Sequence, residues 1–326
     1  MARSPGPSCP ALPHPTPSPT PPAHPLPRYP HKIVLKTCGQ TTLLRCLQTL
    51  LRCTEALGLE LEWVGYSRKN YTFPGDQLPP HSTFDEEMAY LKSNPALTAT
   101  LRGSGYVLGP ITGDHWFVFV ADKCERPSKE STERTVNLMM FDLDPEVART
   151  FYVDGPSKGD GKAQTSMSGL SKLCPGWQFD EHAFEPCGYS MNALRLGSYA
   201  TVHVTPEPQC SYASFETNDA LANYDGLIRN VLAVFKPRRF VLTMFADAEA
   251  QTQYDSPFSA ATLLTPCGTY ARGSTSSATI ESDTCLQMAP YTRLPPGAGK
   301  SPKNLRPRAA SVGQPVGAAG RPKGVR

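Results

Sequence analysis

The sequence predicts an α+β domain built around mainly antiparallel β-sheet. Strand-type and helix-type patterns are interspersed along the middle of the chain, and most pairs of expected strands are joined by connections too short for a parallel crossover. A third observation sets the limits of the domain, because both ends of the chain have compositions that cannot form a core. We therefore expect one folded unit over residues 31–285.

Two helices are predicted in the first third of the chain. Thr41 or Thr42 can cap a helix whose leucines recur at helical spacing, namely Leu43, Leu44, Leu47, Leu50, Leu51 and Leu57. A second helix is expected over residues 84–92, since it opens with three acidic residues, which favour a helix N-terminus. It should end near Asn94-Pro95, because a residue before proline disfavours the helical conformation.

Short apolar or alternating segments predict the strands. We expect strands over residues 32–37, 116–120, 136–143, 199–205, 210–216 and 240–245. The segment 154–170 is rich in Gly, Ser and Lys, and we expect it to be a loop. Asn218 or Asp219 can cap a further helix, which should end before Pro237.

The two ends of the chain predict tails. Residues 1–30 contain 12 of the 34 prolines, and residues 286–326 contain eight Lys or Arg but no Asp or Glu. Removing these eight cations from the net charge of +3 leaves −5, so the basic character belongs to the tail. A basic tail can contact nucleic acid or an acidic membrane, but without a nucleic-acid module a solvated tail is the commoner case. We expect neither nucleic acid nor membrane as a partner.

The ten cysteines are scattered and form no C-x-x-C pair, which argues against a zinc site or a thioredoxin-type motif. We therefore expect no metal. The sequence has no apolar run typical of a signal peptide or a membrane span. These features predict reduced thiols and a cytosolic location.

A few positions are candidates for chemistry. Cys38 follows an expected strand and precedes a helix cap, where a helix N-terminus and Lys36 would lower the pKa of its thiol; an ordinary half-buried thiol is the commoner alternative. His203 lies in the middle of a strand, where a structural role is commoner. Glu207 is held between two prolines at a strand end, which suggests a carboxylate aimed at ribose hydroxyls or a cation. Residues 184–192 form a Pro/Gly-shaped turn that is suggestive without identifying a reaction.

Six groups of residues occur in one order along the chain. They are Leu35-Lys36-Thr37-Cys38-Gly39, Tyr66-Ser67-Arg68-Lys69-Asn70, Leu143-Asp144-Pro145, Pro186-Cys187-Gly188-Tyr189-Ser190-Met191-Asn192, His203-Val204-Thr205-Pro206-Glu207-Pro208, and Ser211-Tyr212 with Ser214-Phe215-Glu216-Thr217-Asn218. Together they resemble the animal-type S-adenosylmethionine decarboxylases over about residues 32–250. The fourth and fifth groups are the specific ones.

The resemblance implies a four-layer αββα sandwich of two antiparallel sheets, incomplete here at the N-terminus. It implies an enzyme, a carboxy-lyase whose decarboxylated product donates aminopropyl groups for spermidine and spermine. In this family a proenzyme cleaves itself at an internal Glu-Ser bond, and the serine becomes a pyruvoyl cofactor that forms a Schiff base with the substrate. The animal enzymes also form homodimers.

The resemblance also implies roles for individual residues. Cys38 matches the proton donor that quenches the carbanion. Ser190 and His203 match the pair that assists self-processing. Glu207 matches the carboxylate that binds the ribose hydroxyls, and Phe184 matches one of two aromatic residues that enclose the adenine.

A second set of residues matches the site at which putrescine stimulates the animal enzymes. The matching residues are Lys36, Ser67, Glu133, Thr135 and Glu216. Glu133 stands where the family usually has Asp, which keeps the charge, whereas Asn137 stands where the family has Glu, which removes one. The resemblance therefore implies putrescine as a possible ligand, with a weakened response.

The sequence departs from the family pattern near both ends. Residues 1–37 contain no Glu-Ser pair, and the family's cleavage position falls at His24. We therefore expect that this chain as written does not form the pyruvoyl group. The resemblance also ends after about residue 250. Two alternatives follow: a non-catalytic family member that binds or regulates an active decarboxylase, or a truncated product.

Overall fold

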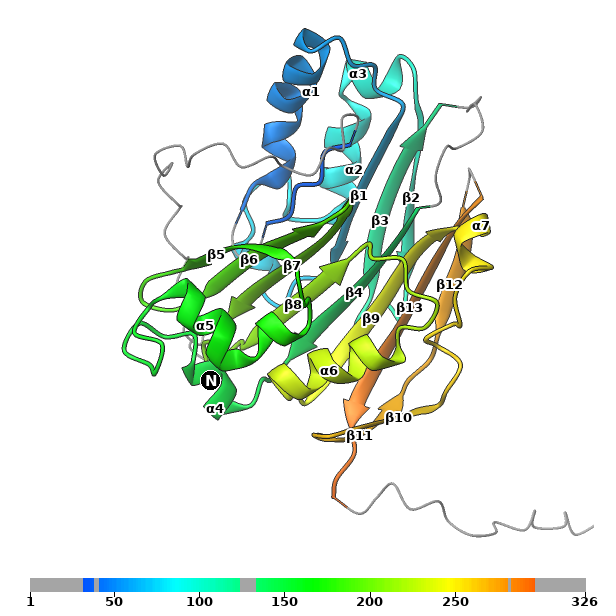
Figure 1. Ribbon diagram of the computed structural model, residues 1–326. Helices are drawn as coiled ribbons and strands as arrows, with labels where there is room; N and C mark the ends of the chain where they lie inside the picture. Colours follow the sequence, from blue (N-terminus) through cyan, green and yellow to red (C-terminus); the bar gives the residue numbers. More distant parts are fainter. Residues whose placement is uncertain (1–31, 38–40, 124–132, 281–282, 297–326) are drawn as a thin grey trace, which may run out of the picture.

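The computed structural model describes residues 32–37, 41–123, 133–280 and 283–296. These residues form two antiparallel sheets that pack face to face, with helices on both outer faces (Figure 1). The resulting order of layers is helices, smaller sheet, larger sheet, helices. This confirms the αββα sandwich that the resemblance implies.

Within the described residues, the smaller sheet has three strands in the order β1-β3-β2. Their bounds are β1 (Trp63–Lys69), β2 (Arg102–Leu108) and β3 (Trp116–Asp122). The larger sheet has ten strands in the order β10-β11-β13-β9-β4-β8-β7-β6-β5, with β12 paired to β13. Their bounds are β4 (Arg134–Phe141), β5 (Gln178–Ala183), β6 (Tyr189–Arg195), β7 (Ser198–Thr205), β8 (Tyr212–Thr217), β9 (Arg239–Asp247), β10 (Thr262–Thr265), β11 (Gly268–Arg272), β12 (Ser276–Ile280) and β13 (Thr284–Arg293).

The helices divide between the two outer faces (Figure 1). The smaller sheet is accompanied by η1 (Leu43–Cys46), α1 (Leu47–Ala56), η2 (Pro74–Asp76), α2 (Phe84–Lys92) and α3 (Pro95–Thr98). The larger sheet is accompanied by α4 (Pro145–Arg149), α5 (Gly161–Ser168), η3 (Leu170–Lys172), α6 (Asp225–Phe235) and α7 (Ala248–Gln251).

Three apolar cores hold these layers together. The largest lies between the larger sheet and its helices, and α6 contributes Ile228, Val231, Leu232 and Phe235 to it. The second lies between the two sheets and includes Val118 and Leu286. The third lies between the smaller sheet and α1, α2 and α3. Because strand side chains alternate between faces, each strand that contributes to the first core must turn its intervening side chains toward the other sheet.

Several predicted elements are confirmed. The leucine pattern forms η1 and α1, and the second predicted helix is α2. The hydroxyl of Thr83 caps α2 by accepting a hydrogen bond from the backbone N–H of Glu86, and the acidic residues occupy its first turn as expected. Strands β3, β4, β7, β8 and β9 lie over the predicted segments.

Other predictions are wrong, each for a local reason. Residues 32–37 were expected to form a strand, but they are outside both sheets; Lys32 and Lys36 attach this segment to the larger sheet through ion pairs with Glu133 and Glu216. The segment 154–170 was expected to be a loop, but it contains α5, which the carboxylate of Asp160 caps. The buried residues of α5 are the polar Gln164 and Thr165, so the sequence has no apolar periodicity that would predict this helix.

Two further boundaries need correction. The last predicted helix begins at Asp225, because Asn218 accepts a hydrogen bond from the backbone N–H of Tyr199, and Asp219 accepts one from the hydroxyl of Ser198. These two side chains join β8 to β7 and do not cap the helix. Strand β13 crosses the predicted domain end at residue 285 and pairs with β9 as far as Thr292. The segment after residue 250, where the resemblance ends, contains β10 to β13.

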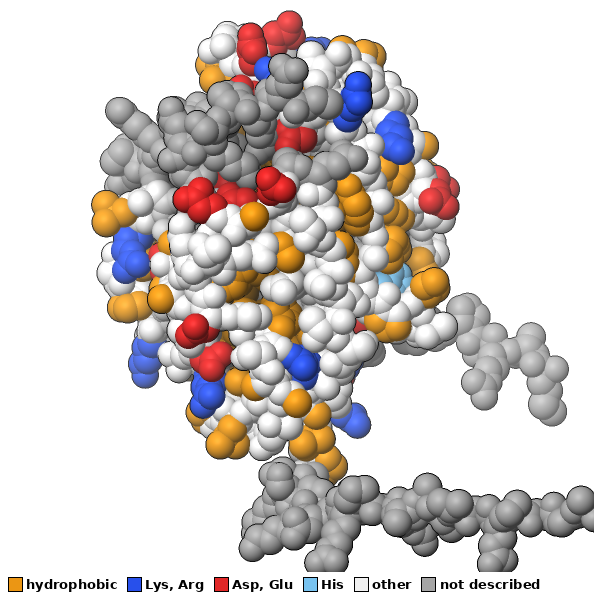
Figure 2. Space-filling model, turned by 90° about the vertical axis from the view of Figure 1, so that its right-hand side faces the viewer, with side chains coloured by type: hydrophobic (Ala, Val, Ile, Leu, Met, Phe, Trp, Pro, Cys, Tyr) orange, Lys and Arg blue, Asp and Glu red, His pale blue; other side chains and the backbone are white. Residues whose placement is uncertain are grey.

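The surface combines apolar and charged side chains. Val107 and Ile111 remain 52% and 87% exposed, which places large apolar groups in contact with water near the end of β2. The side view in Figure 2 shows hydrophobic side chains interspersed with acidic, basic and other polar ones. The exposed apolar side chains on that face are therefore separated by charged side chains.

Candidate functional site

Ser190 and His203 lie opposite each other on neighbouring strands of the larger sheet. The register of β6 and β7 pairs these two residues directly. Their sequence neighbours Tyr189, Met191 and Val202 belong to the core beneath the helices. Ser190 and His203 therefore project from the opposite face, which we call the inner face because it is turned toward the smaller sheet. The structure thus brings together two residues that are 13 positions apart in the sequence.

The imidazole of His203 is held in its neutral form. Burial, together with the nearby ammonium group of Lys36, lowers its pKa to about 4, while the carboxylate of Glu216 acts in the opposite direction. A neutral imidazole has one nitrogen that can accept a proton and one that can donate it. His203 is therefore prepared for acid–base chemistry at neutral pH.

Glu207 follows β7 in a turn, where its carbonyl oxygen accepts a hydrogen bond from the backbone N–H of Cys210 at 3.0 Å. Its carboxylate oxygen Oε2 is buried and makes no hydrogen bond of good geometry among the described residues, although the carboxylate lies close enough to the Cys187 thiol to interact with it. A buried oxygen of this kind is costly unless a ligand or water supplies a donor. The position is consistent with a carboxylate that receives hydroxyl groups from a bound molecule.

Phe184 lies at the same end of the sheet, just after β5. Its backbone N–H donates to the carbonyl of Gly188 at 3.1 Å, and its ring meets the ring of His182 edge-on with centroids 4.6 Å apart. Gly188 has a φ of 121°, a conformation that glycine adopts without strain. A Cβ there would make only an ordinary van der Waals contact with the Cβ of Phe184, 3.4 Å away, so the backbone conformation is what favours glycine. Glycine therefore allows the turn that places this ring.

An open pocket adjoins these residues. It is lined by Tyr152, Val153, Asp154, Glu185 and Pro186. Tyr152 connects it to both sides of the site, since its backbone bridges to Cys187 and its hydroxyl donates to the carbonyl of Pro206 at 3.4 Å. Burial raises the pKa of the Cys187 thiol to about 11, with the Glu207 carboxylate as a further cause, so this thiol stays protonated.

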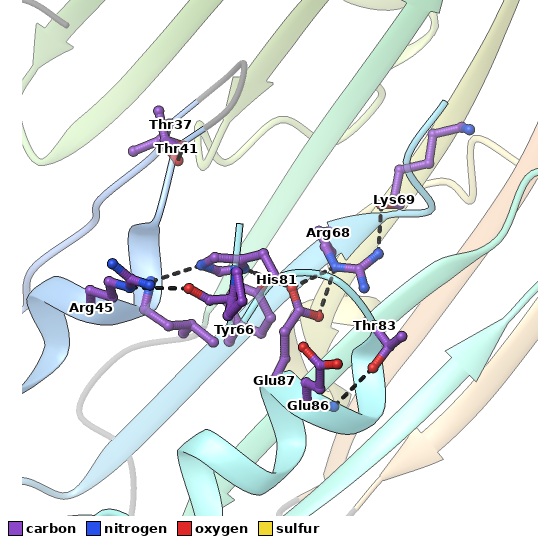
Figure 3. Close-up of polar contacts among 12 residues, drawn as sticks. Thr37, Thr41, Arg45, Tyr66, Arg68, Lys69, His81, Thr83, Glu86 and Glu87 are labelled. Atoms are coloured by element: carbon purple, nitrogen blue, oxygen red, sulfur yellow. Dashed lines mark hydrogen bonds and ion pairs between the residues drawn. The ribbon is translucent and has the colours of Figure 1, made fainter. Parts of the chain in front are cut away.

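Cys38 lies outside the described residues, and its predicted role stays a prediction. The residues on either side of it are described. The hydroxyl of Thr41 donates to the hydroxyl of Thr37 at 2.7 Å (Figure 3). Lys36 points to the larger sheet, where its ammonium group pairs with Glu216. Lys36, two positions before Cys38 in the sequence, therefore contacts the larger sheet on the inner face, on which Ser190 and His203 also lie.

The residues expected to bind putrescine gather along β4 and β8. Lys36 Nζ lies 2.9 Å from Glu216 Oε2, and the hydroxyl of Tyr199 donates to Glu216 Oε1 at 3.1 Å. Glu216 is paired in register with Asn137 on β4, whose buried Oδ1 has no hydrogen-bond partner within the described part of the chain. Thr135 precedes Asn137 by two positions and so shares its face.

The other two members of this set are Glu133 and Ser67. Glu133, just before β4, forms an ion pair with Lys32, and its backbone N–H donates to Asp247 at 2.7 Å. Ser67 is on β1 of the smaller sheet, in register with Val118 of the core between the sheets. It faces the larger sheet but is exposed.

Sequence reasoning missed Lys32 and Tyr199 as partners of the two acids. Tyr199 shares a strand face with His203, because the two are four positions apart, and this alternation was the signal that could have revealed it. Cys187 and Tyr152 were likewise not assigned a place beside Glu207. Their proximity arises from a bridge between segments 35 positions apart, which no local pattern indicates.

The described residues contain no group of three or more His, Cys, Asp or Glu side chains that could hold a metal ion. Nor does any helix within them have the length and apolar character needed to cross a membrane. Cys46, Cys53, Cys174, Cys187, Cys267 and Cys285 are free, whereas Cys210 is disulfide-bonded, which differs from the expectation of reduced thiols.

Comparison with known proteins identifies the family. The family model described as adenosylmethionine decarboxylase matches residues 28–292. The S-adenosylmethionine decarboxylase proenzyme of Dictyostelium discoideum is 42% identical over 220 residues, which cover 67% of this chain and 56% of the relative. That of Leishmania donovani is 38% identical over 223 residues, covering 68% and 57%. The chain belongs to the adenosylmethionine decarboxylase family, and it spans 56–57% of the length of these two relatives.

A solved structure agrees with this assignment. The crystal structure of a Trypanosoma brucei AdoMetDC-delta26 monomer superposes with a TM-score of 0.58 at 26% identity. The superposition covers 81% of this chain and 97% of that one. The two-sheet architecture is therefore shared with a solved member of the family.

Proposed function

We propose that this chain carries the substrate-binding and processing residues of the family's function, the pyruvoyl-dependent decarboxylation of S-adenosylmethionine for spermidine and spermine synthesis, although residues 1–37 hold no Glu-Ser pair from which the chain as written would form the pyruvoyl group. The observation that carries the proposal is the pairing of Ser190 with a neutral His203 on the inner face, at the same end of the sheet as Glu207 and Phe184. Family membership gives this arrangement its chemical meaning. The cytosolic location predicted from the sequence is part of the same proposal.

Each residue has a role that its environment supports. The buried Oε2 of Glu207 is available to accept hydrogen bonds from ribose hydroxyls, which are stronger when the acceptor is charged. The ring of Phe184 offers an apolar face to the adenine, and a nearby sulfonium would gain from cation–π attraction. His203 moves a proton to or from the processing intermediate, and the hydroxyl of Ser190 supports it across the strand pair.

The pyruvoyl group, when bound, supplies an electron-withdrawing carbonyl that stabilises the negative charge left by loss of CO2. The Ser190–His203 pair would assist the formation of such a group, because a neutral imidazole can accept a proton from a serine hydroxyl and return it to a leaving group. Residues 1–37, however, supply no Glu-Ser pair at which this chain as written would form it. Cys38 is proposed as the proton donor to the decarboxylated carbon, as the family resemblance implies.

We further propose that the chain responds weakly to putrescine. The two acids of the matching site already have intramolecular cations, since Lys32 pairs with Glu133 and Lys36 pairs with Glu216. Asn137 supplies no third negative charge. A thermal-shift titration with putrescine should therefore show little stabilisation, whereas Asn137→Glu should gain a response. Strong stabilisation of the wild-type protein would contradict this proposal.

A non-catalytic role is the second candidate. It is favoured by the inner-face side chains of β5 and β6, because Asp180, His182 and Asn192 are exposed there and available to another chain. The partner would be a second copy of this chain, as in the homodimers of the family, or an active decarboxylase. Co-purification with an active copy as a stable complex would support it.

Two measurements separate these candidates. Release of labelled CO2 from carboxyl-labelled S-adenosylmethionine by the purified protein tests catalysis directly, with His203→Ala as the inactive control. Intact mass spectrometry tests the cofactor, because processing yields two chains, the larger one bearing a pyruvoyl group. A single chain of 35.4 kDa without CO2 release would overturn the catalytic proposal and leave the non-catalytic one.

A further inference from the structure

A buried polar cluster lies beneath the helices of the smaller sheet, apart from the residues of the proposed active site. It consists of Glu87 on α2, His81 in the loop before α2, and Tyr66 and Arg68 on β1 (Figure 3). Glu87 is completely buried, and His81 is 2% exposed. Charged groups this deeply buried are uncommon unless they are paired.

The carboxylate of Glu87 is the centre of the cluster. Its Oε1 accepts a hydrogen bond from the hydroxyl of Tyr66 at 2.7 Å and faces His81 Nδ1 at 2.8 Å. Arg68 Nε donates to both carboxylate oxygens, at 2.8 and 2.7 Å. The negative charge is therefore well compensated, which ties α2 to β1.

The tautomer of His81 follows from its second contact. The backbone N–H of Leu44 donates to His81 Nε2 at 3.2 Å. A backbone N–H can only donate, so Nε2 must carry a lone pair and the ring proton must be on Nδ1, from which it is donated to Glu87. The ring thus connects Glu87 of α2 to the backbone of η1 and is neutral in this arrangement.

Leu44 lies at the start of η1, where backbone N–H groups have no partner within the helix. Thr42, at the cap position, makes no side-chain capping bond. His81 takes over this function from a distant loop, and Arg45 Nε adds a bond to the carbonyl of Pro79 at 3.0 Å. The beginning of η1 is therefore fixed by the loop that contains His81.

We propose that His81 is a pH-sensitive positioning residue that fixes the start of η1 against the smaller sheet. Protonation places a hydrogen on Nε2, where it opposes the N–H of Leu44, and so releases the start of the helix. The role of His81 does not depend on the proposed function. Only its consequence rests on that function: η1 follows Lys36 and Thr37 closely in the sequence, so the position of η1 constrains how Lys36 and Thr37 reach the larger sheet.

The charged and titratable groups around His81 come from every neighbouring element. They are the carboxylate of Glu87 on α2 and the guanidinium groups of Arg68 on β1 and Arg45 on η1. Tyr66 of β1 contributes its phenol, whose pKa is raised by burial and by Glu87, so it remains a hydrogen-bond donor. With Glu87 already paired to Arg68, the main loss on protonation is the bond to Leu44.

The test is hydrogen–deuterium exchange at the Leu44 amide of the full chain, measured from about pH 8 to about pH 5. After correction for intrinsic exchange, protection should fall about tenfold or more toward the acidic end, as expected for loss of one hydrogen bond. His81→Gln and His81→Asn form a matched pair. The glutamine amide reaches the position of Nε2 and should protect Leu44 at every pH, whereas asparagine reaches only the position of Nδ1 and should protect it at none.

Equal protection in the two variants, or pH-independent protection in the wild-type protein, would overturn the proposal. If a variant does not fold, nitrogen-15 NMR of the wild-type ring decides the matter, because a proton on Nε2 at alkaline pH would contradict the assignment. Both measurements use the protein without substrate. A failed decarboxylase assay therefore leaves this inference standing, and a failed exchange experiment leaves the proposed function standing.

Discussion

Acidification should destabilise the folded chain through His203. Burial and Lys36 lower the pKa of this imidazole from 6.5 to about 4 in the folded protein, whereas the unfolded chain titrates near the ordinary value. As the pH falls below the ordinary histidine pKa of 6.5, the unfolded chain binds a proton that the folded chain does not, so the free energy of unfolding decreases. Between about pH 7 and about pH 5, this linkage removes about 2 kcal/mol.

Urea denaturation of the wild-type protein and of His203→Asn at these two pH values measures the effect. The wild-type protein should lose about 2 kcal/mol more than the variant, because the other titrating groups are common to both. Ser190→Ala is the matched control, since it alters the facing residue but keeps the imidazole, and it should retain the wild-type dependence. Equal pH dependence in the wild-type protein and His203→Asn would refute the conclusion that the imidazole is neutral and buried.

Three further predictions concern His203, Glu87 and Cys174. Lys36→Ala should raise the pKa of His203 and Glu216→Gln should lower it, because the two residues act on the imidazole with opposite sign; NMR titration measures both, and shifts in one direction would contradict the assignment. Glu87→Ala should lower the free energy of unfolding, measured in urea, by about 3–5 kcal/mol, since it leaves Arg68 buried without its partner. The control is Glu86→Ala on the same helix turn. Because Glu86 is exposed, this substitution should change the free energy of unfolding by less than about 0.5 kcal/mol. Cys174, whose pKa burial raises to about 12, should react with iodoacetamide at least about a hundredfold more slowly than the exposed Cys46, as peptide mass spectrometry can measure; comparable rates would show that this core opens readily.

The sequence was most informative where local pattern and burial coincide. The leucine spacing of α1 and the acidic first turn of α2 are local signals, and each element forms where they indicate. In contrast, α5 buries polar side chains, one of which, Thr165, meets the hydroxyl of Tyr189 at 2.7 Å. Its stability depends on the strand beside it, which a local window cannot contain.

In the candidate site, too, the sequence predicts some features and misses others. Alternation along β7 correctly separates His203 from its apolar neighbours, and the family resemblance pairs it with Ser190. The ion pairs of Lys32 and Lys36, however, join segments 101 and 180 positions apart. The same is true of the contact between Tyr152 and Cys187, so these partners follow from the packing of the sheets and not from spacing.

Glu207 and Phe184 are proposed to form part of a binding site for S-adenosylmethionine. Isothermal titration calorimetry of the full chain with S-adenosylmethionine tests it without requiring turnover. We predict binding by the wild-type protein that weakens at least about tenfold in Glu207→Gln, as expected for loss of a charge-assisted hydrogen bond, and that is unchanged in Glu249→Gln, an exposed carboxylate on α7. No binding by the wild-type protein, or equal affinity in Glu207→Gln, would contradict the claim.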